Sequence, residues 1–272
     1  MVTEQIYERP RDYDLEHETD CEDLGFYTQL LSDWRPRRVL ELACGSARVT
    51  LPLAELGART GFDIVGVELA QPMLEEAERK RAAAPPDVQS RVTFVRGDMR
   101  FWRDDKGRFD VILTPGSSMR HVLTLEDQLA VWRAAWDNLM PGGRFIVDVA
   151  SPDLAACASA AQVPARKVLD LDTDSTDPVS GERLIRYKAV TYLPHQQCAQ
   201  TTFLYDKFDR HHRVERYVSD FEAHVYFPRE LQLLFLHTGF EIEAIFGDWR
   251  RAPLRRTSSQ MIAIGRKGEG RQ

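Results

Sequence analysis

The sequence predicts an α/β protein with a Rossmann-like sheet of seven strands and an antiparallel β insertion between the fifth strand and the last helix. Three observations support this prediction. Residues 38–70 follow the order strand, glycine turn, helix, strand. Short apolar segments then alternate with helical patterns up to residue 150, as expected for a parallel sheet. Between residues 151 and 227 the pattern changes to β-rich segments separated by turn residues, which indicates three or four antiparallel strands.

This pattern divides the chain into four segments. Residues 1–37 are expected to form an N-terminal lid or cap, and residues 38–150 a Rossmann-like core that binds a cofactor. Residues 151–227 form the antiparallel insertion, which we expect to cap the substrate. Residues 228–267 then return to the core and complete its sheet.

The composition is that of an ordinary globular protein with an acidic balance. Hydrophobic residues make up 43% of the 272 residues and charged residues 29%, enough to bury a full core. The formal net charge of −6 offers no general attraction for phosphate backbones, so a nucleic-acid partner is not expected. No apolar run is long enough to span a bilayer, and the first residues lack the apolar centre of a signal peptide. We therefore expect a cytoplasmic protein without a membrane partner.

The cysteines are widely scattered, with no C-x-x-C pair and no Cys/His cluster. This spacing suggests reduced thiols and no structural zinc. The four cysteines are Cys21, Cys44, Cys157 and Cys198.

The N-terminal segment contains one clear helical pattern. Residues 1–20 are polar and acidic, whereas residues 22–34 carry apolar side chains at helical spacing. Arg35 and Pro36 end this helix before the first strand. We expect the helix either to cover the edge of the sheet or to act as a lid over cofactor and substrate.

Residues 38–70 predict an adenosine-cofactor site. An apolar strand at residues 39–42 ends in small residues around Gly45, and a helix and a second apolar strand follow. Glu68 closes that second strand, roughly 20 residues after the glycine turn. In an open parallel sheet, ligands bind beyond the carboxyl ends of the strands, where an acidic residue at this spacing can hold a ribose diol.

The remaining core elements alternate in the same way. We expect helices at residues 72–84 and 127–140 and strands at residues 92–95, 109–113 and 144–149. Thr124 has the pattern of an N-cap for the second of these helices, with Asp127 at the third helical position. The sequence Pro141-Gly142-Gly143 predicts a turn before the fifth strand.

The C-terminal part returns to the α/β pattern. A helix is expected from Pro228 to the glycine at position 239, because proline favours the first helical turn and glycine the residue after the end. Residues 240–246 and 260–265 then predict strands six and seven, joined by a loop rich in Arg, Ser and Thr.

The glycine turn indicates which adenosine cofactor is bound. A dinucleotide requires G-x-G-x-x-G, whereas residues 43–48 read A-C-G-S-A-R and contain a single glycine. At this point the sequence resembles the class I S-adenosylmethionine-dependent methyltransferases, whose first motif has the form E-x-G-x-G-x-G. The motif stands here as Glu41-Leu42-Ala43-Cys44-Gly45-Ser46-Ala47. The resemblance covers nearly the whole chain and implies S-adenosylmethionine as cofactor and S-adenosylhomocysteine as product.

The resemblance also assigns residues to the cofactor. Gly97-Asp98-Met99 is similar to the family's third cofactor motif, in which the carboxylate accepts the adenine amine and the next backbone amide meets a ring nitrogen. A nearby carboxylate such as Glu41 would favour the cationic sulfur. The residues expected at the cofactor are Glu41, Ala43, Cys44, Gly45, Glu68, Leu69, Met73, Asp98, Met99 and Thr114.

Two residues are candidates for catalysis. His121 follows the fourth strand in the loop that we expect to face the methyl group, and imidazole titrates near neutrality. Tyr13, within Asp12-Tyr13-Asp14, resembles the N-terminal Tyr-Asp pair of antibiotic-sugar N-methyltransferases, in which the tyrosine lies at the active site. His224 and Tyr226 are weaker candidates for lining a substrate pocket. No set of side chains indicates covalent catalysis, and we expect no metal.

The layout resembles small-molecule N-methyltransferases that act on amino sugars or glycopeptides in bacterial secondary metabolism, including antibiotic biosynthesis. We therefore expect methyl transfer to an amine of a small molecule. The alternatives are O- or C-methylation of an aromatic or polyketide-like acceptor with His121 as base, and a non-catalytic scaffold that only binds the cofactor. The sequence is compatible with a homodimer.

Overall fold

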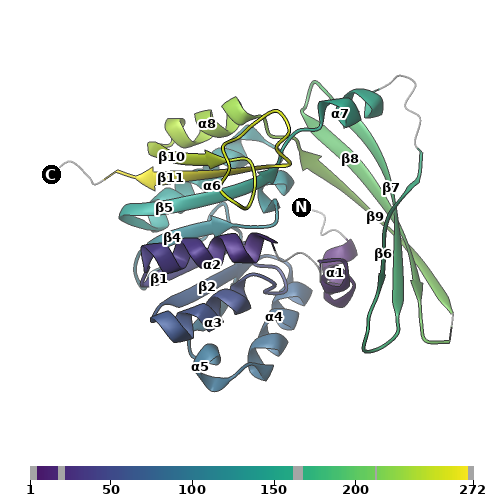
Figure 1. Cartoon of the computed structure of the whole chain (residues 1–272), viewed down its shortest axis with the longest axis horizontal. Coiled ribbons are helices and arrows are strands. Elements are labelled where there is room, and N and C mark those ends of the chain that lie inside the picture. Colours follow the sequence, from purple (N-terminus) through teal and green to yellow (C-terminus); the bar gives the residue numbers. More distant parts are fainter. Residues whose placement is uncertain (1–4, 18–21, 162–167, 212, 269–272) are drawn as a thin grey trace. The chain divides into compact units, whose positions relative to one another are not determined.

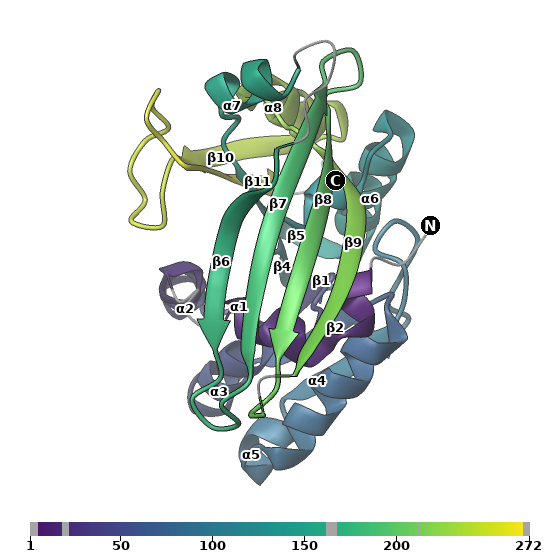
Figure 2. The ribbon, with the colours of Figure 1, turned by 90° about the vertical axis from the view of Figure 1, so that its right-hand side faces the viewer.

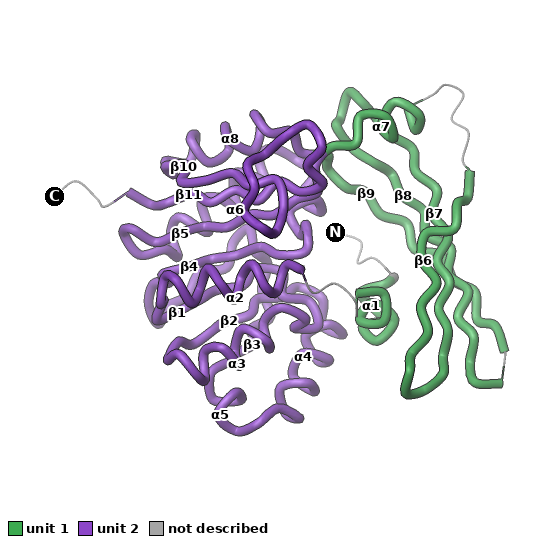
Figure 3. The backbone as a smooth tube through the Cα atoms, in the orientation of Figure 1, with its two compact units in different colours: residues 1–20, 152–225 green, residues 21–151, 226–272 purple. Residues whose placement is uncertain are grey.

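The computed structural model describes residues 5–17, 22–161, 168–211 and 213–268, which form two compact units (Figure 3). Residues 21–151 and 226–272 make up one, called here the core unit. Residues 1–20 and 152–225 make up the other, called here the sheet unit. The segment expected to form one N-terminal lid, residues 1–37, is thus divided between the units. Cys21 lies outside the described residues.

A seven-stranded sheet organises the core unit, as predicted (Figure 1). Its strand order is β10-β11-β5-β4-β1-β2-β3. Neighbours from β5 to β3 pair in parallel, while β11 runs antiparallel to both β5 and β10. The strands are β1 (Arg38–Leu42), β2 (Asp63–Glu68), β3 (Val92–Arg96), β4 (Phe109–Thr114), β5 (Leu139–Ala150), β10 (Phe240–Phe246) and β11 (Gln260–Lys267).

Both faces of this sheet are buried, which explains why its strands read as continuous apolar runs. In β1, Val39 packs into one hydrophobic cluster and Leu40 into the other. In β5, Ile146 belongs to the first cluster and its neighbours Phe145 and Val147 to the second. The alternation follows from the pleat, because successive side chains point to opposite faces of a strand.

Helices supply the layers on either side of the sheet (Figure 1). Apolar residues of α2 and α3 belong to the first cluster, and those of α6 and α8 belong to the second. The helices of the core unit are α2 (Glu22–Trp34), α3 (Thr50–Thr60), α4 (Gln71–Ala83), α5 (Pro86–Gln89), η2 (Ser118–His121), α6 (Leu125–Asn138) and α8 (Pro228–His237).

Several predicted boundaries are confirmed, and two are wrong. The Thr124 side chain caps α6 by accepting a hydrogen bond from the Asp127 amide at 3.1 Å, as predicted. However, α6 ends at Asn138 rather than residue 140, because Leu139 already pairs with Phe109 as the first residue of β5. The predicted turn at Gly142 lies inside β5, where the register shifts relative to β4. The short helices α5 and α7 were not predicted, since fewer than two full turns show no periodicity.

An antiparallel sheet of four strands forms most of the sheet unit, and Figure 2 shows them side by side. The strand order β6-β7-β8-β9 is that of a simple meander, which confirms the predicted insertion. The elements are η1 (Gln5–Glu8), α1 (Pro10–His17), α7 (Leu154–Ala160), β6 (Asp170–Thr176), β7 (Arg183–Leu193), β8 (Cys198–Phe208) and β9 (Val214–His224).

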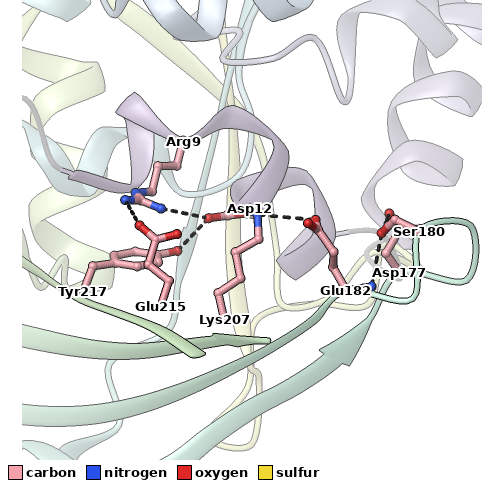
Figure 4. Close-up of polar contacts among 8 residues, drawn as sticks. All are labelled: Arg9, Asp12, Asp177, Ser180, Glu182, Lys207, Glu215 and Tyr217. Atoms are coloured by element: carbon pink, nitrogen blue, oxygen red, sulfur yellow. Dashed lines mark hydrogen bonds and ion pairs between the residues drawn. The ribbon is translucent and has the colours of Figure 1, made fainter. Parts of the chain in front are cut away.

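Polar contacts of Asp12 and of Arg9, the residue preceding the helix, hold helix α1 on this sheet (Figure 4). Asp12 is 4% exposed, and its carboxylate accepts hydrogen bonds from Lys207 Nζ at 2.7 Å and from the Tyr217 hydroxyl at 3.0 Å. Arg9 pairs with Glu215 at 2.6 Å. These partners come from β8 and β9, which explains why an N-terminal segment belongs to the same unit as residues 152–225.

Two further findings complete the description. The cysteines among the described residues, Cys44, Cys157 and Cys198, are free thiols. Among the described residues, no helix combines the length and apolar character needed to cross a membrane.

Candidate functional site

The predicted cofactor residues meet at the carboxyl edge of the core sheet. The parallel strands β1 to β4 all end there, so the turn after β1, Glu68 after β2 and Asp98 after β3 lie on neighbouring connections. Backbone hydrogen bonds join these connections: the Cys44 amide donates to the Val67 carbonyl at 3.0 Å, and the Gly97 amide donates to the Glu68 carbonyl at 2.9 Å. The structure therefore brings together three groups that the sequence separates by about 25 residues each.

The turn after β1 keeps the backbone of a glycine-rich loop although two of its glycine positions hold alanine. Ala43, Gly45 and Ala47 all have positive φ, at 58°, 55° and 69°. This left-handed conformation costs a residue with a Cβ about 1–2 kcal/mol. The strain lies at the point where a ligand would approach, as is common at functional sites. A Cβ on Gly45 would lie 3.3 Å from Met73 Cε, so this position is also tightly packed.

Glu68 is anchored so that one acceptor position remains for a ligand. Its Oε1 accepts from the amides of Leu69 at 2.9 Å and Ala70 at 2.8 Å. Its Oε2 accepts from the Gly45 amide at 3.0 Å. A carboxylate offers about four acceptor positions. Glu68 is half-buried, so its carboxylate is not sealed from solvent.

Asp98 is paired with an arginine that the sequence analysis did not single out. Its Oδ2 accepts from Arg100 Nη2 at 2.6 Å, and its Oδ1 accepts from the Arg100 backbone amide at 2.9 Å. Burial opposes the charge of Asp98, but these hydrogen bonds outweigh it and lower the pKa of the carboxyl. Arg100 Nη1 also contacts Asp127 Oδ2 at 2.9 Å.

The other predicted cofactor residues lie around the same edge with different exposure. Leu69 is 42% exposed and offers an apolar face, whereas Met99 is half-buried. The Thr114 hydroxyl is buried and donates to the Ile146 carbonyl at 3.4 Å. The side chains of Cys44 and Met73 are buried and are not open to a ligand.

Glu41 is 1% exposed and accepts a hydrogen bond from the Thr50 hydroxyl at 2.8 Å. Burial raises the pKa of Glu41 to about 8, against an ordinary value of 4.5. At neutral pH the carboxyl is therefore mostly protonated. Its predicted electrostatic role toward a sulfonium stays a prediction.

A buried polar network next to this site was missed by the sequence analysis. The Tyr27 hydroxyl of α2 donates to Asp148 Oδ1 at the end of β5, and the Ser117 amide donates to Asp148 Oδ2 at 3.0 Å. Burial raises the pKa of Asp148 to about 6. Arg48 of the glycine turn pairs with Asp23 of α2 at 2.5 Å. Each of these pairs joins residues that are far apart in the chain, so no local sequence pattern indicates them.

The two catalytic candidates lie in different units. His121 ends the short helix η2 in the core unit and is half-buried. Its loop is fixed by the Tyr226 hydroxyl, which donates to the Met119 carbonyl at 3.2 Å. Tyr13 lies on α1 in the sheet unit, where its ring stacks on His17 with centroids 4.2 Å apart. Both catalytic roles stay predictions.

The weaker candidates His224 and Tyr226 are also divided between the units, and both are buried. Among the described residues, no group of three or more His, Cys, Asp or Glu side chains is placed to hold a metal ion.

Comparisons with known proteins show what this chain is similar to. Residues 39–143 match the family described as "Methyltransferase domain". The putative methyltransferase YqeM of Bacillus subtilis is 30% identical over 114 residues, which are 42% of each chain. The cypemycin N-terminal methyltransferase of a Streptomyces species is 33% identical over 125 residues, 45% of this chain and 46% of that protein. The chain thus spans less than half the length of these curated relatives.

Solved structures extend the likeness to nearly the whole chain. The CcbJ methyltransferase of Streptomyces caelestis superposes with a TM-score of 0.71 at 21% identity, covering 91% of this chain and 90% of that one. The sugar N-methyltransferase KedS8 of a Streptoalloteichus species superposes with a TM-score of 0.66 at 19% identity, covering 97% and 92%. At such identities the likeness shows the fold. Residues 39–143 match a methyltransferase domain, and the chain has the fold of the class I S-adenosylmethionine-dependent methyltransferases.

Proposed function

We propose that this chain transfers a methyl group from S-adenosylmethionine to an amine of a small secondary metabolite. One observation carries the proposal. A strained glycine-type turn at residues 43–47 and two partly exposed carboxylates, Glu68 and Asp98, converge at the carboxyl edge of a parallel sheet. This is where an open α/β sheet binds its ligand.

The residues present fit the proposed cofactor. Glu68 would hold a ribose hydroxyl with its remaining acceptor position, and Asp98 would accept the adenine amine. The Met99 amide would meet a ring nitrogen, and the exposed Leu69 would cover a face of the base. When bound, the cofactor supplies an electrophilic methyl group on a sulfonium. The chain's own task is to align the acceptor with that group and to exclude water.

The acceptor in this proposal is an amine. A neutral amine already carries the lone pair that attacks, so its methylation needs alignment more than proton removal. The candidate base His121 is therefore not required for this proposal. Proteins similar to this chain include the sugar N-methyltransferase KedS8 and the cypemycin N-terminal methyltransferase.

The test is an acceptor screen with S-adenosylmethionine labelled on the methyl group. Amino sugars, peptides with a free N-terminus and phenols would be incubated with the protein, and labelled products would be identified by mass spectrometry. We expect label on nitrogen of one amine class. Transfer to phenols with none to amines would contradict the proposal.

O- or C-methylation is the second candidate, because His121 lies in a fixed loop next to the Asp148 network. A phenol must lose its proton during transfer, which requires a base near the acceptor. If His121 is that base, His121→Ala lowers turnover of a phenol by about 100-fold or more and alters its pH profile. An unchanged rate and profile would exclude this role. A scaffold without activity would bind S-adenosylhomocysteine yet label no acceptor.

A further inference from the structure

Arg100 engages both carboxylate oxygens of Asp98. Its Nε lies 3.0 Å from Oδ1 and 3.1 Å from Oδ2, and its Nη2 lies 2.6 Å from Oδ2. The Arg100 backbone amide adds a fourth contact, 2.9 Å from Oδ1. The two Nε contacts share one N–H, so three N–H groups of Arg100 occupy most of the about four acceptor positions of the carboxylate. Yet this is the carboxylate that the proposed function assigns to the adenine amine.

Arg100 has a second carboxylate within reach. Its Nη1 contacts Oδ2 of Asp127, in the first turn of α6, at 2.9 Å. The guanidinium thus bridges Asp98 and Asp127, and all three side chains are partly open to solvent, with exposures of 19%, 22% and 34% for Arg100, Asp98 and Asp127. A guanidinium between two such acceptors can give up hydrogen bonds to one and keep the other at small cost.

We propose that Arg100 is a specificity-determining residue that competes with the adenine base for Asp98. In the free protein Arg100 occupies Asp98. When the base binds, Arg100 releases Asp98 in part and is retained by Asp127. This inference rests on the proposed function, because it takes Asp98 as the acceptor for the adenine amine.

The competition has two consequences. It weakens the binding of cofactor and product alike, because each must displace hydrogen bonds that the free protein already makes. It also sets the selectivity at position 6 of the purine. An amine there donates to Asp98, whereas a carbonyl oxygen accepts from Arg100. The arginine therefore reduces the preference for adenine over hypoxanthine.

The test is calorimetric titration of S-adenosylhomocysteine and of its hypoxanthine analogue S-inosylhomocysteine into four proteins: wild type, Arg100→Leu, Asp127→Asn and the double variant. We expect Arg100→Leu to tighten S-adenosylhomocysteine by about two- to fivefold, the range that a partly exposed ion pair supports. Asp127→Asn is expected to weaken the binding of S-adenosylhomocysteine by about the same factor, because Arg100 then loses its alternative partner and stays on Asp98. In the double variant the effect of Asp127→Asn should vanish.

The affinity for S-inosylhomocysteine is a second test. Arg100→Leu should weaken S-inosylhomocysteine while it tightens S-adenosylhomocysteine, so the ratio of the two affinities rises. A variant that merely fails to fold would weaken both, and its melting temperature would reveal this. Arg100→Lys serves as the conservative variant, because it keeps the charge without the bidentate geometry. We expect the ratio of the two affinities in Arg100→Lys to lie between those of wild type and Arg100→Leu.

The possible failures are distinguishable. If wild type binds neither ligand, the proposed function fails. If wild type binds S-adenosylhomocysteine but folded Arg100→Leu binds it more weakly, the cofactor site stands and competition by Arg100 is overturned. Arg100 would then support Asp98 instead of competing with the base.

Discussion

Ala43 and Ala47 adopt a backbone conformation that is unfavourable for alanine, yet the fold retains it. Both lie in the left-handed region with φ of 58° and 69°, which glycine adopts without strain. From sequence, the alanines cast doubt on the glycine turn. The structure keeps its shape, because the surrounding hydrogen bonds, such as Gly45 to Glu68 at 3.0 Å, fix the neighbouring residues.

Ala43→Gly and Ala47→Gly should each raise the free energy of unfolding by about 0.5–1 kcal/mol. Relief of left-handed strain outweighs the extra freedom of glycine in the unfolded chain. Denaturant unfolding monitored by circular dichroism measures the change. The matched control is Ala130→Gly inside α6, which should lower stability by about 1 kcal/mol. Losses at positions 43 and 47 equal to the control would contradict the left-handed assignment.

Glu41 gives the fold a predictable dependence on pH. Because burial raises the pKa of Glu41 from 4.5 to about 8, the folded state holds this proton more tightly than the unfolded state. Stability contributed by the protonated carboxyl is therefore complete below about pH 4.5 and declines as pH rises through about 8.

Replacing the Glu41 carboxyl should reduce the loss of stability with rising pH. Glu41→Gln keeps an acceptor for Thr50 but cannot ionise, so we expect a smaller loss of stability between pH 5 and 8, by a few kcal/mol at most. Thermal unfolding across this pH range measures it. Glu55→Gln, at an exposed position of α3, is the control and should follow wild type. An unchanged pH dependence in Glu41→Gln would show that Glu41 ionises normally.

Among single residues, the positions of Glu68 and Asp98 could be predicted from sequence, because Glu68 ends one apolar strand of the parallel sheet and Asp98 lies two residues past the end of the next. The partner of Asp98 could not. Arg100 is only two residues away, but nothing in the sequence indicates that its side chain turns back on Asp98 and also reaches Asp127.

At the scale of elements, the sequence predicted the bounds of α2 but not the hydrogen bond that joins it to β5. Its apolar spacing gives the helix, while the hydroxyl of Tyr27 and the carboxylate of Asp148 meet across 121 residues of chain. Tyr27→Phe should lower the free energy of unfolding by about 1–3 kcal/mol, because a buried carboxylate then loses a donor. A double-mutant cycle with Asp148→Asn measures the coupling. Strict additivity of the two substitutions would contradict the pairing.

Helix α1 depends on the same kind of pairing within the sheet unit. Asp12→Asn should loosen α1, because Lys207 and Tyr217 would lose a charged partner. Amide hydrogen exchange in α1 should accelerate by about tenfold or more. The control is Glu8→Gln at an exposed position of η1, which should leave exchange unchanged. Equal protection in both variants would show that the buried carboxylate does not hold the helix.

For the molecule as a whole, alternation of strands and helices predicted the seven-stranded sheet and the antiparallel insertion. These features follow from hydrophobic periodicity, which is local. The division into units is not local: residues 5–17 belong with residues 152–225 through ion pairs such as Asp12 with Lys207. Charged residues that pair at long range look the same in sequence as solvated ones.

The central claim is that Glu68 and Asp98 together hold the ribose and the base of a methyl donor. Calorimetric titration of S-adenosylhomocysteine into wild type and into a Glu68→Ala, Asp98→Ala double variant tests it most directly. We expect saturable binding to wild type and a loss of affinity of about a hundredfold or more in the folded double variant, because charge-assisted hydrogen bonds at two sites are removed. Equal affinity in the two proteins would contradict the account.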